Sequence, residues 1–131
     1  MPHTDPPVVT RDEGRPFLGL GAPVYRLMHP KTVGSDQLGV SLCCMQPGDR
    51  VRRHRHVYEE AYYVLRGSGT MWLEGHGELR LQEGMSVYIA SNRGHGQVND
   101  GDEPLEILCS LSPPPVEGEL PEFIDDEEDA A

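Results

Sequence analysis

The chain has 131 residues, the length of one ordinary domain, and its 15 glycines and 12 prolines interrupt the hydrophobic segments every few residues. Its net charge of -11, with a single short basic run at 50–55, argues against nucleic acid and anionic membranes as partners, and no segment approaches membrane-spanning length. The first ten residues lack the cationic start and apolar run of a signal peptide, so we expect a cytoplasmic protein.

The order of segments along the chain predicts a single all-β domain with an extension at each end. Residues 1–16 are polar and contain prolines, and we interpret them as an N-terminal arm. Residues 17–112 hold short apolar or alternating segments separated by glycine-rich, proline-rich and Asx-rich turns, an order typical of an antiparallel meander in a barrel or sandwich. The predicted strands are 24–28, 38–45, 60–65, 70–73, 79–81, 86–90 and 105–111.

Residues 113–131 differ from the rest of the chain in charge. Eight of the 22 acidic residues lie here, and no lysine or arginine accompanies them. Three consecutive prolines at 113–115 end the last predicted strand. We therefore expect a solvated acidic tail, with Phe123 and Ile124 as its only candidates for burial.

The three cysteines, Cys43, Cys44 and Cys109, predict free thiols. Their number is odd, and adjacent cysteines rarely pair with each other. A zinc site built from them would lack the usual C-x-x-C spacing. We expect buried, unpaired cysteines.

The residues most indicative of chemistry are His54, His56 and Glu60. Alternation along a strand places His54 and His56 on one face, where both imidazoles can bind one ion. If residues 57–59 form a bend, Glu60 begins the next strand and its carboxylate joins them. We assign the neighbouring Glu59 to the surface. Imidazole and carboxylate donors suit iron, manganese, nickel or zinc.

A second stretch, 84–99, supplies a further histidine, His95, after a strand and a turn. We expect His95 to be the fourth ligand and Asn99 to secure the turn that follows it. Here the chain resembles the cupin superfamily, whose motifs read G-x5-H-x-H-x3-4-E-x6-G and G-x5-P-x-G-x2-H-x3-N. The first motif matches throughout, at Gly48, His54, His56, Glu60 and Gly67. The second matches at Gly84, His95 and Asn99, while Ala90 and Asn92 replace its proline and glycine.

This resemblance implies an antiparallel β-barrel or jelly roll with one divalent metal ion inside, held by His54, His56, Glu60 and His95. It implies a small-molecule substrate and a homodimer. The function that we expect is that of a dioxygenase-like oxidoreductase acting on a small oxygenated compound, with Glu60 and Tyr62 as catalytic residues. The alternatives are a redox-neutral zinc or nickel enzyme (polyketide cyclase, isomerase or lyase) and a non-catalytic ligand-binding protein.

Several other polar residues have simpler explanations. Tyr62 is as compatible with a core tyrosine whose hydroxyl is satisfied as with a catalytic one. The arginines at 50, 52, 53 and 55 could attract an anion, but we favour a solvated strand face paired with surface acids. We place His29 and His76 in a loop and an exposed turn, respectively, and neither is expected to bind metal.

Overall fold

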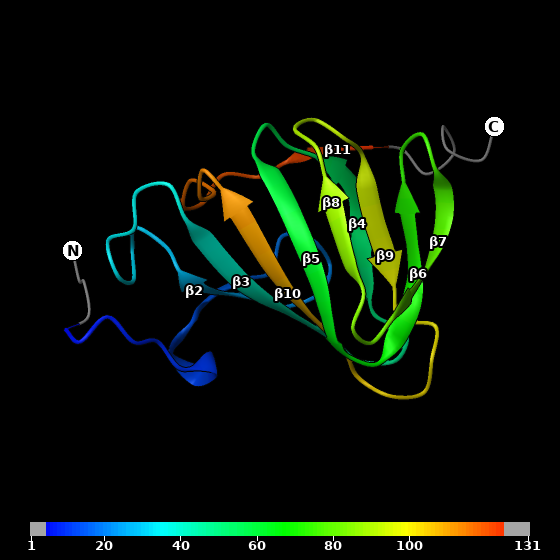
Figure 1. Ribbon diagram of the computed structural model, residues 1–131, viewed down its shortest axis with the longest axis horizontal. Helices are drawn as coiled ribbons and strands as arrows, with labels where there is room; N and C mark the ends of the chain where they lie inside the picture. Colours follow the sequence, from blue (N-terminus) through cyan, green and yellow to red (C-terminus); the bar gives the residue numbers. More distant parts are fainter. Residues whose placement is uncertain (1–4, 125–131) are drawn as a thin grey trace.

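Two antiparallel β-sheets pack face to face in the computed structural model, which describes residues 5–124 (Figure 1). One sheet has the strand order β1-β2-β3-β10-β5-β8 and the other β11-β4-β9-β6-β7. The elements are η1 (Arg11–Glu13), β1 (Arg15–Phe17), β2 (Val24–Met28), β3 (Gly39–Met45), β4 (Arg50–Arg55), β5 (Glu59–Arg66), β6 (Ser68–Leu73), β7 (Gly77–Gln82), β8 (Ser86–Ile89), β9 (His95–Val98), β10 (Leu105–Ser112) and β11 (Glu122–Phe123).

The all-β prediction is confirmed, and the two sheets have the arrangement of a jelly roll rather than of one closed barrel. The expected meander is wrong. Apart from β1-β2-β3 and β6-β7, the strands adjacent in each sheet are not consecutive in the chain; β10, for example, lies between β3 and β5. Turn residues show where the chain reverses, but they do not show which strand it then pairs with.

Alternation of side chains explains why these segments bury one face. Along β5, the buried residues are Glu60, Tyr62 and Val64, and the residues between them are exposed. β6 and β10 show a similar alternation. The inward side chains form one core between the sheets, in which seven apolar residues have no exposed surface: Met45, Val64, Met71, Leu81, Ile89, Leu105 and Ile107.

One row of paired residues crosses the six-stranded sheet and later defines the pocket. Arg26 on β2 pairs with Ser41 on β3, Ser41 with Cys109 on β10, and Cys109 with Tyr62 on β5. Residues directly opposite each other in neighbouring strands project from the same face. All four of these side chains are buried, so the row lines the interior.

The three cysteines are free, as expected, although Cys44 is only half-buried while Cys43 and Cys109 are buried. His29 lies in a bend, as expected for a loop residue, but its side chain is buried and its ring Nε2 lies 2.7 Å from the carbonyl oxygen of Pro115. No helix among the described residues is long and apolar enough to cross a membrane.

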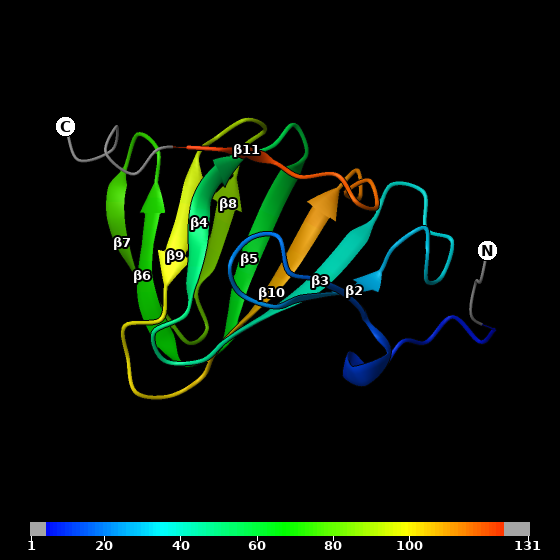
Figure 2. The same ribbon diagram turned by 180° about the vertical axis from the view of Figure 1, so that it is seen from behind.

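The segment after β10 crosses to the other sheet and ends in β11, beside β4 (Figure 2). Pro114 and Pro115 are buried, which the expectation of a solvated tail did not include; Ile124 is buried, as the sequence allowed, and residues 116 and 118–120 are exposed. The prolines that end β10 also turn the chain back over the interior, an effect that composition does not reveal. The division predicted at residue 16 falls inside β1; residues 1–4 and 125–131 lie outside the described residues.

Replacing Ile124 by alanine tests the packing of this segment. Ile124 is 9% exposed, its amide donates to the carbonyl of Arg53, and its side chain lies against Gly94 beside Trp72. Loss of this buried side chain should lower the free energy of unfolding by about 2 kcal/mol in urea denaturation. The control Val116→Ala, at a position 61% exposed, should change it by less than about 0.5 kcal/mol. Equal effects of the two variants would contradict this account.

Candidate metal centre

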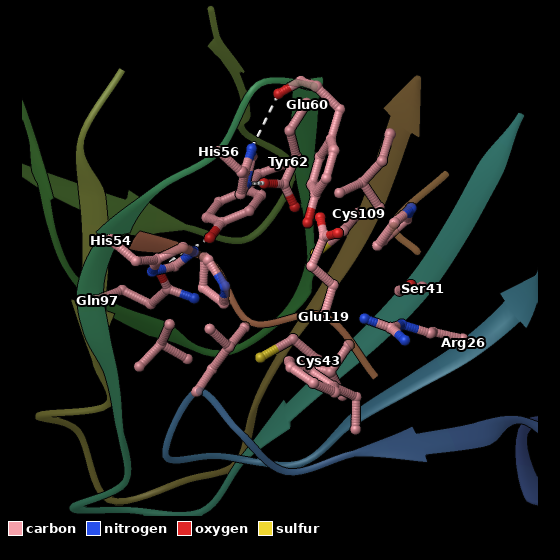
Figure 3. A pocket seen from close by; sticks show the side chains of 18 residues that line it. Arg26, Ser41, Cys43, His54, His56, Glu60, Tyr62, Gln97, Cys109 and Glu119 are labelled. Carbon is pink, nitrogen blue, oxygen red and sulfur yellow. Dashed lines mark hydrogen bonds and ion pairs between the residues drawn. The ribbon is translucent and has the colours of Figure 1, made fainter. Parts of the chain in front are cut away.

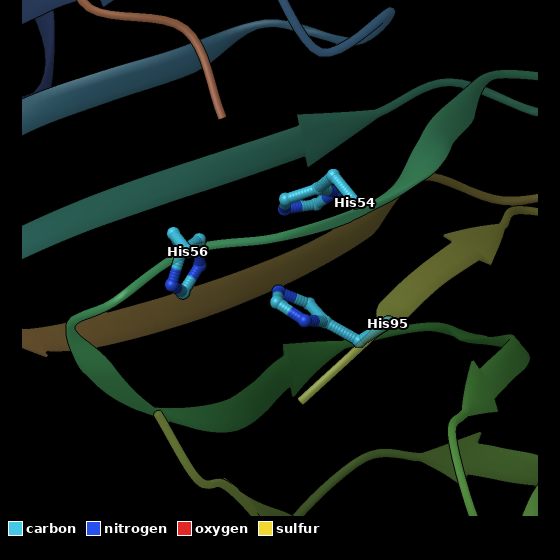
Figure 4. Close-up of side chains that lie close together, drawn as sticks. All are labelled: His54, His56 and His95. Atoms are coloured by element: carbon cyan, nitrogen blue, oxygen red, sulfur yellow. The ribbon is translucent and has the colours of Figure 1, made fainter. Parts of the chain in front are cut away.

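Three histidine side chains converge between the sheets (Figure 4). His54 at the end of β4 pairs with His95 at the start of β9, and His56 follows β4 directly. Their potential ligand atoms all lie within 4.8 Å of one another. Two nitrogens on opposite sides of one ion would be about 4.2 Å apart, so small movements would bring all three onto one ion.

An irregularity in β4 aims these histidines inward. Val51 pairs with Gln97, but His54 pairs with His95, so β4 uses one residue more than β9 over this interval. Such a bulge changes the alternation of the strand and re-aims the side chains that follow. As a result Val51, His54 and His56 all line the interior.

Backbone carbonyls fix the orientation of each imidazole. The Nδ1 atoms of His54, His56 and His95 lie 2.6, 2.9 and 2.9 Å from the carbonyl oxygens of Arg52, Tyr58 and Arg93. A carbonyl can only accept, so Nδ1 carries the proton, and in a neutral ring Nε2 presents its lone pair to the centre. Burial, together with the neighbouring His95, lowers the pKa of His54 to about 3, which keeps this ring neutral.

Glu60 reaches the same centre from β5, in the opposite sheet. Its Oε1 lies 3.1 Å from Nε2 of His56 and 3.3 Å from Nε2 of His95. Burial favours the neutral carboxyl, but the two adjacent imidazoles outweigh this effect and lower the pKa of Glu60 to about 2. The site therefore holds a carboxylate at neutral pH.

These donor groups fit a divalent metal ion. When these rings are neutral, with the proton on Nδ1, the Nε2 lone pairs of His56 and His95 face a carboxylate oxygen, and such acceptors repel one another. Either a proton on Nε2, as in the hydrogen bonds that lower the pKa of Glu60, or a cation must then lie between them. Nε2 of His95 is fully buried and has no hydrogen-bond partner among the described residues. An unpaired buried polar atom is costly, and a metal ion would satisfy it together with the other donors.

A pocket opens from this centre into the space between the sheets (Figure 3). The Tyr62 hydroxyl donates to Oε1 of Gln97 at 3.0 Å, and both side chains line the pocket. The ring of Tyr58 stacks on His56 with centroids 4.1 Å apart. At the other end, Arg26 and Ser41 line the wall. The pocket thus combines polar groups at both ends with apolar walls, as small-molecule sites do.

The structure brings together all four residues expected to bind metal, and it places Tyr62 beside them; their roles as ligands and catalysts remain predictions. Glu59 points outward, where it accepts a hydrogen bond from Tyr88. Asn99 secures the turn after β9, since its amide donates to the carbonyls of Met45 and Glu103.

Several pocket residues were not predicted from the sequence, among them Arg26, Tyr58 and Gln97. Gln97 could have been found, because it follows His95 by two residues in a strand and so shares its face. Tyr58 lies in the bend between His56 and Glu60, where the sequence does not indicate which way a side chain points. Arg26 enters the pocket only through the pairing of β2 with β3.

Comparison with known proteins agrees with this architecture. The family model described as "Cupin domain" matches residues 41–111. Auxin-binding protein 1 from Arabidopsis thaliana is 32% identical over 79% of this chain, which spans about half (54%) of that protein. Polyketide synthase CurC from Streptomyces cyaneus is 33% identical over 86% of this chain and 73% of its own length. The structure of polyketide cyclase RemF from Streptomyces resistomycificus superimposes with a TM-score of 0.74, at 21% identity, over 92% of this chain and 87% of that one.

Proposed function

Since the chain belongs to the cupin family, we propose that it is a metal-dependent enzyme that converts a small oxygenated organic substrate in the pocket between its sheets. The single observation that carries the proposal is the convergence of His54, His56, His95 and Glu60 beside that pocket. A protein that kept these residues only for packing would leave the buried Nε2 of His95 without a hydrogen bond, with the Glu60 carboxylate 3.3 Å away.

The donor set of three imidazoles and one carboxylate suits iron, manganese, nickel or zinc. When bound, such an ion supplies Lewis acidity toward substrate oxygen atoms and, in the case of iron, a site for redox chemistry. His54, His56, Glu60 and His95 would hold it.

The remaining roles in the site are to bind and orient the substrate and to transfer protons. Glu60 is ionised at neutral pH, so its carboxylate can accept a proton from a substrate carbon or hydroxyl group. The hydroxyl of Tyr62 is directed at Gln97 Oε1, which leaves the Gln97 amide nitrogen able to donate to a substrate oxygen. Val51 and Leu111, both buried, help to exclude water from the pocket.

Two reaction classes would use these groups, and we place the redox-neutral one first. CurC, a polyketide synthase by name, supports a substrate rich in carbonyl and hydroxyl groups, in which cyclisation or isomerisation needs proton transfer at Glu60 and polarisation of oxygen atoms but no oxidant. The dioxygenase reaction expected from the sequence is the second candidate, favoured by a donor set that also suits iron. A homodimer and a cytoplasmic location remain predictions.

Elemental analysis of protein purified without added metal or chelator tests the proposal. We expect close to one transition-metal ion per chain, because four donors bind tightly when backbone hydrogen bonds hold the three imidazole rings in place. Zinc or nickel would support the redox-neutral reaction. Iron, together with oxygen consumption when a polyhydroxylated aromatic probe such as quercetin is added, would support the dioxygenase reaction. Protein that contains no metal and takes up none on dialysis against each of the four ions would overturn the proposal.

A further inference from the structure

An arginine side chain lies inside the pocket, at the opposite end from the histidines. Arg26 is 4% exposed, although it belongs to β2, near the edge of its sheet. The phenyl ring of Phe17 covers its guanidinium, at 4.4 Å from the ring centroid. Figure 3 shows the guanidinium directed toward the pocket rather than toward solvent. Arginine is rarely this buried unless its charge is paired.

The pairing of this charge within the chain is weak. Nη1 of Arg26 lies 3.4 Å from Oε2 of Glu117, beyond the usual length of a charge-assisted hydrogen bond. Glu117 is itself 30% exposed and makes a closer ion pair with Arg15. A guanidinium has five N–H donors, and among the described residues Glu117 is the only hydrogen-bonding partner of this one. Arg26 therefore retains donors for an anion that enters the pocket.

A second donor lies next to it. Ser41, directly opposite Arg26 in the strand pairing, is 3% exposed and lines the same pocket. Figure 3 places its hydroxyl beside the Arg26 guanidinium. Two adjacent buried donors, one of them charged, can together bind an oxyanion.

We propose that the substrate carries a carboxylate and that Arg26, assisted by Ser41, binds it. This inference rests on the proposed function, because it assumes that the substrate occupies this pocket. Arg26 is three strands away from Tyr62 along the row, which corresponds to about 14 Å between their backbones. The carboxylate is therefore bound apart from the metal centre, and the reacting oxygen atoms lie at the other end of the substrate.

Charge in the pocket selects a carboxylate over a phosphate. Arg26 is the only cationic side chain among the pocket's lining residues, and the carboxylates of Glu60 and Glu119 line the same space. One guanidinium offsets a single negative charge, and a planar monoanion matches its two-pronged geometry, whereas a dianion would bring a second negative charge into a pocket also lined by Glu119. Glu117 acts as a weak internal competitor for the guanidinium.

The test is an NMR titration of the full chain, followed through the Arg26 Nε–H and Ser41 amide signals. The probes are butyrate and butanamide, which have the same number of heavy atoms and differ in charge. Each is added to zinc-loaded and to metal-stripped protein at pH 7. Butyrate should shift both signals in both states and bind about tenfold more tightly than butanamide. Shifts that disappear on stripping the metal would place the carboxylate on the ion, and they would overturn this inference while leaving the proposed function intact.

Two variants separate Arg26 from general effects. In Arg26→Met, which keeps an unbranched side chain, the preference for butyrate over butanamide should be lost at the Ser41 signal. If this variant does not fold, Glu117→Gln provides an independent result: removal of the competing carboxylate should tighten butyrate binding about threefold. Equal binding of butyrate and butanamide by the unmodified chain, unchanged affinity in Glu117→Gln, or tighter binding of inorganic phosphate than of butyrate would each overturn the assignment.

Discussion

Replacement of both His54 and His56 by alanine should reduce the metal content from near one ion per chain to less than about 0.1 after desalting. The two substitutions remove two of the four converging donors and leave only His95 and Glu60, which come from different sheets. Two ligands on separate strands cannot enclose an ion, so any remaining metal would exchange with solvent. Elemental analysis of the unmodified and doubly substituted chains, purified side by side, gives the comparison.

A matched control for this experiment is His76→Ala, since His76 is an exposed turn histidine. This variant should keep its full metal content. Far-ultraviolet circular dichroism should show the same β-sheet spectrum for all three proteins, which excludes unfolding as the cause of metal loss. Full metal content in the double variant would reject His54 and His56 as ligands.

The local part of the site could be predicted from sequence because strand geometry determines it. His54 and His56 are two residues apart, so alternation places them on one face, and a bend before Glu60 was enough to predict its carboxylate near them. His95 is nearly forty residues further along the chain, and only the spacing of the second motif connected it to the same centre. The bulge in β4 was not predictable, yet it is the reason that Val51 faces the same interior as His54.

The rest of the pocket depends on which strands pair, and this information is not local. Arg26 looked like an ordinary strand residue, and the tail looked solvated from its charge. β2 pairs with β3, which brings Arg26 into the pocket row, and Pro115 packs over the interior once the chain crosses between the sheets. Composition describes a segment in isolation, whereas burial depends on the surfaces that the fold offers to it.

Two glycines with positive φ, Gly67 of the first motif and Gly75 outside both motifs, show the same distinction between local and long-range causes. Gly67 has a φ of 84°, and Gly75, in the β6–β7 turn, has a φ of 87°. Both need the left-handed conformation that side chains disfavour by about 1–2 kcal/mol. A Cβ at Gly67, however, would lie 2.3 Å from the carbonyl oxygen of Pro104, whereas at Gly75 no atom lies within 4 Å. Of these two glycines, Gly67 is therefore the one that allows another backbone segment to approach closely.

Gly67→Ala should therefore lower the free energy of unfolding by about 4 kcal/mol, or prevent folding, because conformational strain and a clash with rigid backbone add together. Gly75→Ala should cost only about 1 kcal/mol, since strain acts there alone. Urea denaturation of both variants, followed by tryptophan fluorescence of Trp72, measures the difference. Because the clash pushes on Pro104, next to the first residue of β10, the weakened β5–β10 pairing should also appear as faster amide exchange at Glu106 and Ile107. Equal destabilisation by the two substitutions would mean that the close approach to Pro104 makes no contribution and that Gly67 serves only the turn.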